Sequence, residues 1–234
     1  MFELLFPKKL IVEVILSKMN EAMAERPVSH GEFLCWLGLW FMMATIQGPN
    51  RRDYWSLKQV DRFEGAPYRF HDIMSRNRFE TILKNIRYTG REAPNHVDRF
   101  HEVREMIDLW NDNMDAQFMS GWIQCLDESM SVWLNRFTCP GFMFVPRKPW
   151  PFGNEYHTIC CGLSGILFRL EIVEGRDFPT ERERPEFNEE GKTVGLLLRL
   201  TRPLWNQGKI VVLDSGFCVL KGIVELKKKG VFAA

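Results

Sequence analysis

The stretch KIVVLDSGF, residues 209–217, decides the fold of this chain. Four apolar residues run directly into Asp214, a hydroxyl and a glycine, which is the pattern of a buried strand that ends on a carboxylate. The segment GWIQCLDESM, residues 121–130, has the same form, because its apolar run leads into Asp127 and Glu128. Two strands that each place an Asp at the carboxyl end predict a shared site.

Composition and charge indicate a soluble protein of the cell interior. Apolar residues make up 45% of the chain and charged residues 26%, far from a disordered composition. The net charge is only +1, so any nucleic-acid binding must come from local basic patches. The cysteines form no CxxC pair and the histidines show no metal-binding spacing, so we expect no zinc. The longest apolar run, residues 33–46, is shorter than the ~20 residues that span a bilayer, so we expect no membrane partner.

The pattern of apolar residues changes near residue 121. Before it, apolar residues recur every three or four positions, which predicts helices with Ser29 and Ser75 as N-caps. After it, apolar runs and turn residues predict the order β-β-β-α-β-α-β, with the last strand barely begun. We therefore expect a helical region in residues 1–120 and an incomplete mixed sheet with flanking helices in residues 121–234.

This order of elements is that of a ribonuclease H-like sheet, in which the first and fourth strands are parallel neighbours. Asp127 and Asp214 would then meet at the carboxyl ends of adjacent strands. Two carboxylates ~4 Å apart repel by roughly 4 kcal/mol at an effective dielectric constant of ~20, so the pair needs a proton or a cation. Oxygen ligands favour Mg²⁺ or Mn²⁺, which could activate a water or a 3′-hydroxyl for phosphoryl transfer. An ordinary strand-end role for each Asp stays open.

Three parts of the sequence resemble the piggyBac-type DDE transposase family. MSRNRFETILKNIRYT (residues 74–89) resembles the helical segment before the family's catalytic core. LDESMSVWLNR (126–136) with FVPRKPWPFGNEYH (144–157) resembles the stretch around the first catalytic Asp. VVLDSGFCVLKGIVELKKKG (211–230) resembles the stretch around the second. The resemblance implies metal-dependent DNA strand cleavage and transfer in the nucleus, with transposon-end DNA as partner, a helical region for dimerisation or DNA binding, and homodimerisation.

The resemblance also implies roles for single residues. Asp127 and Asp214 would be the first two members of the catalytic, metal-binding acidic triad, with Mg²⁺ or Mn²⁺ as cofactor. Ser215 stands where the family usually has Asn, and Glu128 either supports the metal ligands or is a solvent-facing strand end. The family's third Asp and its zinc-binding tail come after strand five, whereas the sequence stops at Ala234. We therefore expect a truncated chain, cut near strand five, that cannot cut DNA.

Basic residues beside aromatic ones occur in two loops. Arg147 and Lys148 precede Trp150 next to the expected site, where they could contact phosphates while the aromatic ring stacks on a distorted end. A solvated turn with Trp150 packed on the sheet is the equal alternative. Arg51 and Arg52 form a similar loop, for which a solvated turn is the better interpretation.

Two functions therefore stay open for the whole chain. One is a DDE-type recombinase that handles DNA ends by hydrolysis and strand transfer. The other is a non-catalytic transposon relic that acts only as a DNA-binding or self-association module. A different ribonuclease H-like nuclease is a weaker third hypothesis, because the segments around the two acids match the transposases so broadly.

Overall fold

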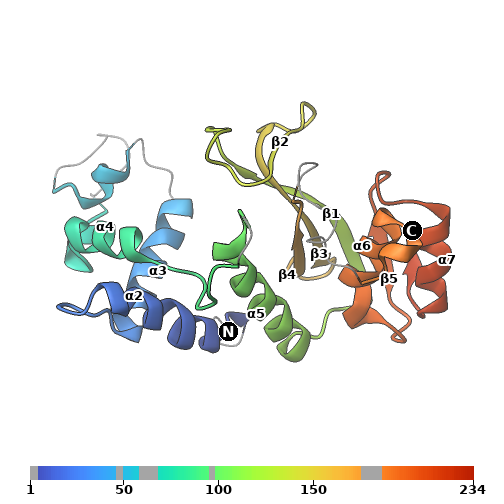
Figure 1. Ribbon diagram of the computed structural model, residues 1–234, viewed down its shortest axis with the longest axis horizontal. Coiled ribbons are helices and arrows are strands. Elements are labelled where there is room, and N and C mark those ends of the chain that lie inside the picture. Colours follow the sequence, from blue (N-terminus) through green and yellow to red (C-terminus); the bar gives the residue numbers. More distant parts are fainter. Residues whose placement is uncertain (1–4, 46–49, 58–67, 95–97, 175–185) are drawn as a thin grey trace. The chain divides into compact units, whose positions relative to one another are not determined.

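The computed structural model describes residues 5–45, 50–57, 68–94, 98–174 and 186–234 (Figure 1). The chain divides into two compact units: a helical unit, Lys8–Glu92, and a sheet unit, Met1–Pro7 with Ala93–Ala234. The predicted boundary near residue 121 marks the change from helices to strands. The compact units divide earlier, because the last helix before the strands packs against the sheet.

The helical unit is built around stacked aromatic rings. Its helical segments are η1 (Leu10–Leu16), α2 (Ser17–Ala22), α3 (His30–Thr45), η2 (Arg51–Trp55), η3 (Phe70–Asp72) and α4 (Arg76–Asn85). The ring of Trp36 lies 5.6 Å from the rings of both Phe33 and Phe79, and its indole N–H donates to the Phe79 carbonyl. The predicted caps are confirmed: the Ser29 hydroxyl accepts from the Glu32 N–H and the Ser75 hydroxyl from the Arg78 N–H.

Arg78 links α4 to α3 inside the helical unit. Its side chain is only 6% exposed. The guanidinium donates to both carboxylate oxygens of Glu32, at 2.6 and 2.8 Å, and to the carbonyls of Arg26 and Pro27, at 3.0 and 3.1 Å. Every branch of this buried cation therefore has an acceptor, as a buried charge requires.

The sheet unit has a mixed six-stranded sheet with the strand order β2-β3-β1-β5-β6, and β4 pairs with β3. The strands are β1 (Ile123–Val132), β2 (Phe142–Phe144), β3 (Phe152–Cys161), β4 (Leu167–Ile172), β5 (Ile210–Leu213) and β6 (Phe232–Ala233). The helical segments are α5 (His101–Gln117), η5 (Asn188–Glu190), α6 (Lys192–Thr201), η6 (Arg202–Leu204) and α7 (Leu220–Lys228). β1 and β5 are parallel neighbours, as predicted, whereas the short strand β2 was not predicted.

The two faces of the sheet differ in cover. Leu126 of β1, Ile159 of β3 and Val211 of β5 are fully buried in one apolar core with Leu197 of α6 and Leu226 of α7. Figure 1 shows α6 and α7, in orange and red, beside β5. Side chains alternate along a strand, so the residues on either side of Leu126 point to the opposite, exposed face of β1.

Helix α5 is tied to the sheet by one side-chain amide. Asn111, which is 3% exposed, donates to the Leu170 carbonyl of β4 at 2.9 Å and accepts from the Leu170 N–H at 3.0 Å. Asp115 of α5 also pairs with Arg169 of β4. Among the described residues, no helix combines the length and the apolar character that crossing a membrane requires.

Candidate active site at the ends of the parallel strands

Asp127 and Asp214 lie at equivalent places on neighbouring strands. The parallel pairing of β1 and β5 runs from Ile123 opposite Ile210 to Leu126 opposite Leu213, so the next residue along each chain is an aspartate. Parallel strands lie roughly 4.8 Å apart, which brings the two backbones close at this point. Both aspartates are exposed and line one open pocket of ≈ 490 Å³. The structure therefore brings the two predicted site residues together.

Each aspartate has one carboxylate oxygen held by the backbone. Asp127 Oδ1 accepts from the N–H of Glu128 at 2.7 Å. Asp214 Oδ1 accepts from the N–H of Ser215 at 2.6 Å and from its hydroxyl at 3.3 Å. Among the described residues, neither Oδ2 has a hydrogen-bond partner, so one oxygen of each carboxylate can take a ligand from the pocket.

Arg147 and Lys148 line the same pocket. Strand β1 continues past the end of β5, and the Lys148 ammonium donates to the Glu128 carbonyl there at 3.1 Å. Arg147 Nη2 lies 2.7 Å from Glu128 Oε2, and its side chain is 62% exposed. The Glu128 carboxylate raises the pKa of Arg147, and Asp214 adds to this effect. Arg147 is thus an exposed cation with Glu128 on one side and Asp214 on the other as its nearby acids.

The predicted aromatic neighbour of this loop is not packed on the sheet. Trp150 is 66% exposed, and Phe152 is 43% exposed, although Phe152 stacks on Phe144 with the ring centres 5.0 Å apart. Trp150 is thus mostly in solvent, and the solvated-turn interpretation of Arg147 and Lys148 stays open.

Arg51 and Arg52 belong to the helical unit, at the start of η2. They line a pocket of ≈ 670 Å³ that is formed by residues of that unit alone. The aromatic residues beside them serve packing, because Tyr54 is 4% exposed and stacks on Phe70 at 5.1 Å. This loop therefore offers cations without free aromatic faces.

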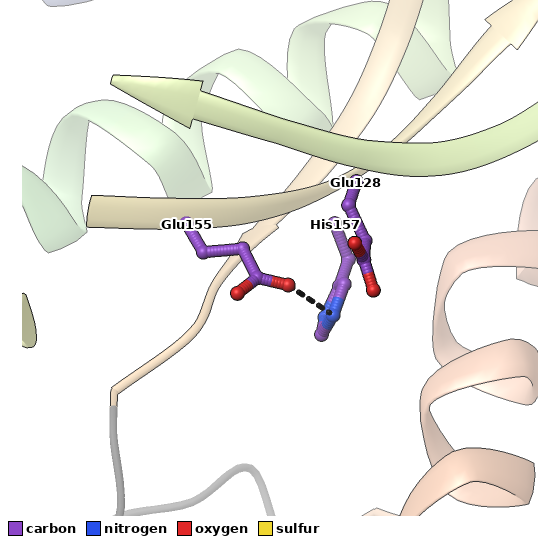
Figure 2. A group of neighbouring side chains, drawn as sticks. All are labelled: Glu128, Glu155 and His157. Atoms are coloured by element: carbon purple, nitrogen blue, oxygen red, sulfur yellow. Dashed lines mark ion pairs between the residues drawn. The ribbon is translucent and has the colours of Figure 1, made fainter. Parts of the chain in front are cut away.

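A second acidic group lies on the other face of β1. Glu128 is opposite His157 of β3 in the antiparallel register, and Glu155 is two residues before His157 on the same face. Figure 2 shows the Glu155 carboxylate pointing at the imidazole of His157, with Glu128 on its other side. One donor atom of each residue lies within 4.8 Å of the other two.

The sequence interpretation missed Glu155 and His157. The available signal was an acid and a histidine two apart in a strand, which places both on one face. Glu128 was considered only for a role beside Asp127, because the strand register alone shows which residue of β1 faces Glu155 and His157. Gly153 permits the close approach of these strands, since a Cβ there would lie 1.9 Å from the Ser131 carbonyl oxygen.

Burial shifts the pKa values of both Glu155 and His157. Glu155 is 6% exposed, and burial raises its pKa, to which the charge of Glu128 adds. Burial also lowers the pKa of His157. Burial favours the uncharged form of each group, and neutral imidazole is the form that binds metals.

Comparisons with known proteins identify the family. A family model described as Transposase IS4 matches residues 1–234. The chain belongs to this transposase family. PiggyBac transposable element-derived protein 3 of Homo sapiens is 26% identical over 200 residues, which cover 83% of this chain and 31% of that protein. The Chimeric ERCC6-PGBD3 protein of Homo sapiens is also 26% identical over 200 residues, covering 18% of its length.

The fold of this transposase chain matches a solved structure of a piggyBac transposase synaptic complex with hairpin DNA. The TM-score is 0.78 at 19% identity, and the match covers 99% of this chain and 49% of the other. The predicted piggyBac-type resemblance and the ribonuclease H-like mixed sheet are thereby confirmed. The chain spans less than a third of the curated relatives that it matches.

Proposed function

We propose that this transposase chain binds DNA ends at the Asp127 and Asp214 pocket and contributes to metal-dependent strand cleavage and transfer. The observation that carries the proposal is the pairing of two aspartates at the ends of adjacent parallel strands, in a pocket that also contains Arg147 and Lys148. Acidic side chains that can bind a cation and basic side chains that can bind phosphate thus line the same pocket.

The donor atoms fit Mg²⁺ or Mn²⁺. Both cations prefer oxygen ligands and keep several waters, which an open pocket with two carboxylates allows. When bound, such ions activate the attacking hydroxyl and stabilise the leaving oxygen of a phosphodiester. Ser215 would keep Asp214 in position, since its N–H and hydroxyl both donate to Oδ1.

Phosphate binding would use Arg147 and Lys148. Arg147 is paired with Glu128 but exposed, so a phosphate could replace that carboxylate without moving a buried group. Exposed aromatic rings of β2, of β3 and of the segments that follow β1 and β2 could stack on splayed bases: Trp133, Phe137, Phe144, Trp150 and Phe152. The solved relative whose fold matches is a complex with hairpin DNA, which supports DNA as the partner.

The test is the salt dependence of DNA binding. Each phosphate contact contributes about 0.9 to the slope of log K against log salt for duplex DNA, so Arg147→Ala with Lys148→Ala should reduce the slope by roughly 2. Lys227→Ala with Lys228→Ala, at the end of α7, is the matched control and should leave it unchanged. An equal slope in parent and Arg147/Lys148 variant would refute the phosphate contacts.

A non-catalytic DNA-binding or self-association module is the second candidate. It is favoured by the apolar side chains that β1 and its following loop expose, among them Trp133, Leu134 and Phe137 at 43, 82 and 79%. A metal-dependent nick in a terminal-repeat duplex that Asp214→Asn abolishes would support the enzyme. DNA binding without any nick, together with a dimer in sedimentation, would support the module.

The remaining parts of the proposal concern the whole protein. We assign residues 1–120 to dimerisation or DNA binding and place the protein in the nucleus, where its DNA substrate lies. Fluorescence of a tagged full-length chain tests the location, and a homodimer that persists without residues 121–234 would support the role of the helical region.

A further inference from the structure

We propose that Glu128, Glu155 and His157 form a binding site for a first-row transition-metal cation such as Zn²⁺, separate from the Asp127 and Asp214 pocket. Successive residues of a strand point to opposite faces, so Asp127 and Glu128 serve different sites although they are neighbours in sequence. The proposal does not depend on DNA binding or cleavage.

The distances suit a small cation. Zn²⁺ binds imidazole nitrogen and carboxylate oxygen at about 2.0–2.2 Å, which places tetrahedral donors roughly 3.4 Å apart. His157 Nε2 and Glu155 Oε1 are 3.7 Å apart, too long for a hydrogen bond but close to that spacing. The donor atoms of all three residues lie within 4.8 Å of one another. A side-chain rotation of Glu128, the more accessible of the two glutamates, would bring its carboxylate to the spacing that Zn²⁺ needs.

Glu155 is the observation that points to a ligand. Its side chain is 8% exposed and is aimed into the group, as Figure 2 shows. No described residue donates a hydrogen bond to its carboxylate, and its one ion-pair neighbour among the described residues is His157, at 3.7 Å. A buried carboxylate without donors is costly, whereas metal coordination satisfies it.

The surroundings favour a transition metal over Mg²⁺. One imidazole and two carboxylates are a nitrogen and oxygen set that suits Zn²⁺, whereas Mg²⁺ prefers oxygen alone. The ring of Phe217 stands edge-on to His157 with the centres 5.3 Å apart and closes that side with apolar surface. Glu171, opposite His157 on β4, is already held by Arg199 at 2.6 and 2.9 Å.

Arg147 would compete with the cation. Its guanidinium donates a hydrogen bond to Glu128 Oε2, so a metal ion that binds Glu128 must share this oxygen with Arg147 or replace it. Removing the exposed guanidinium with Arg147→Ala should therefore tighten Zn²⁺ binding, whereas it should weaken phosphate binding at the neighbouring pocket.

The test is Zn²⁺ calorimetry together with Co²⁺ absorption on the full 234-residue chain. With excess Mg²⁺ present to fill the Asp127 and Asp214 pocket, we expect one Zn²⁺ per chain and visible Co²⁺ bands, with affinity weakened roughly tenfold or more by Glu155→Gln and by His157→Gln. Under the same conditions Asp127→Asn and Asp214→Asn should leave the affinity of this Zn²⁺ and the Co²⁺ bands unchanged, which separates this site from the DNA-cleavage proposal. Exposed Glu189→Gln is the control for charge alone.

Folding of the variants is checked by the thermal midpoint. Glu155→Gln removes a buried charge, so it should keep or raise the midpoint without metal and should lose the rise that Zn²⁺ gives the parent chain. Absence of Zn²⁺ binding by the folded parent would overturn the site. Binding that survives Glu155→Gln and His157→Gln but is lost in Asp127→Asn would equally overturn it, because the metal would then belong to the other face of β1.

Discussion

Two buried charges in this molecule have opposite surroundings. Arg78 in the helical unit has an acceptor for each branch of its guanidinium, in Glu32 and two carbonyls. Glu155 in the sheet unit is equally buried but has no hydrogen-bond donor among the described residues. A satisfied buried ion holds elements together, whereas an unsatisfied one is a cost that a ligand can remove. Arg78 therefore serves to hold the fold together, whereas Glu155 is available to bind a ligand.

Breaking the satisfied pair should have the largest effect. Arg78→Met leaves Glu32 and the Arg26 and Pro27 carbonyls without a donor, so the free energy of unfolding should fall by about 3–5 kcal/mol. Urea denaturation measures it. Arg76→Met is the control, because Arg76 is exposed and its ion pair with Glu80 is long, at 3.7 Å. This change should lower the free energy of unfolding by less than about 1 kcal/mol. Equal effects of the two changes would contradict the structural role.

The same pair predicts a loss of stability in acid. Hydrogen bonding by Arg78 holds the pKa of Glu32 below its ordinary value. A carboxyl with a lowered folded-state pKa stabilises the fold above its unfolded pKa of about 4.3, and this contribution disappears as the pH falls through the folded value. Midpoints measured between pH 7 and pH 3 should fall less steeply in Glu32→Gln than in the parent chain. Parallel curves would show that Glu32 is not the group concerned.

Neutralising the unsatisfied charge should act in the opposite direction. Glu155→Gln keeps the shape of the side chain and removes its unpaired charge, so the metal-free chain should gain about 1 kcal/mol in unfolding free energy at pH 7. Chemical denaturation in the presence of a chelator measures it. A loss of stability instead would show that the carboxylate has a structural partner.

Removing the exposed Arg147, which lies near both Glu128 and Asp214, should have the smallest effect on the stability of the fold. Arg147→Ala should leave the free energy of unfolding nearly unchanged, because surface ion pairs contribute little. Its effect should appear in binding, as the lower salt slope for DNA and the tighter Zn²⁺ affinity. A large stability loss would mean that the Arg147 contact with Glu128 organises the strand.

The sequence predicted what depends on local pattern. The apolar runs before Asp127 and Asp214 indicated two strands, and their order predicted that these strands are parallel neighbours. Ser29 and Ser75 were recognisable caps because a cap is read within four residues. These features need no information from distant parts of the chain beyond the order of elements.

What depends on register and long-range pairing could not be predicted. The Asn111 amide joins α5 to Leu170, which is far along the chain, so the compact unit begins before the first strand. Glu155 and His157 meet Glu128 only through the register of β1 and β3. A shift of one residue would turn Glu128 to the other face, which is why no spacing rule could find the group.

The central claim is that Asp127 and Asp214 share one divalent-cation site. Calorimetry with Mg²⁺, which prefers oxygen ligands alone, on the parent chain, Asp127→Asn, Asp214→Asn and Glu155→Gln tests it most directly. The account predicts that Mg²⁺ binding is lost in each aspartate variant and is kept in Glu155→Gln. Binding that persists in both aspartate variants, or that is missing from the folded parent chain, would contradict it.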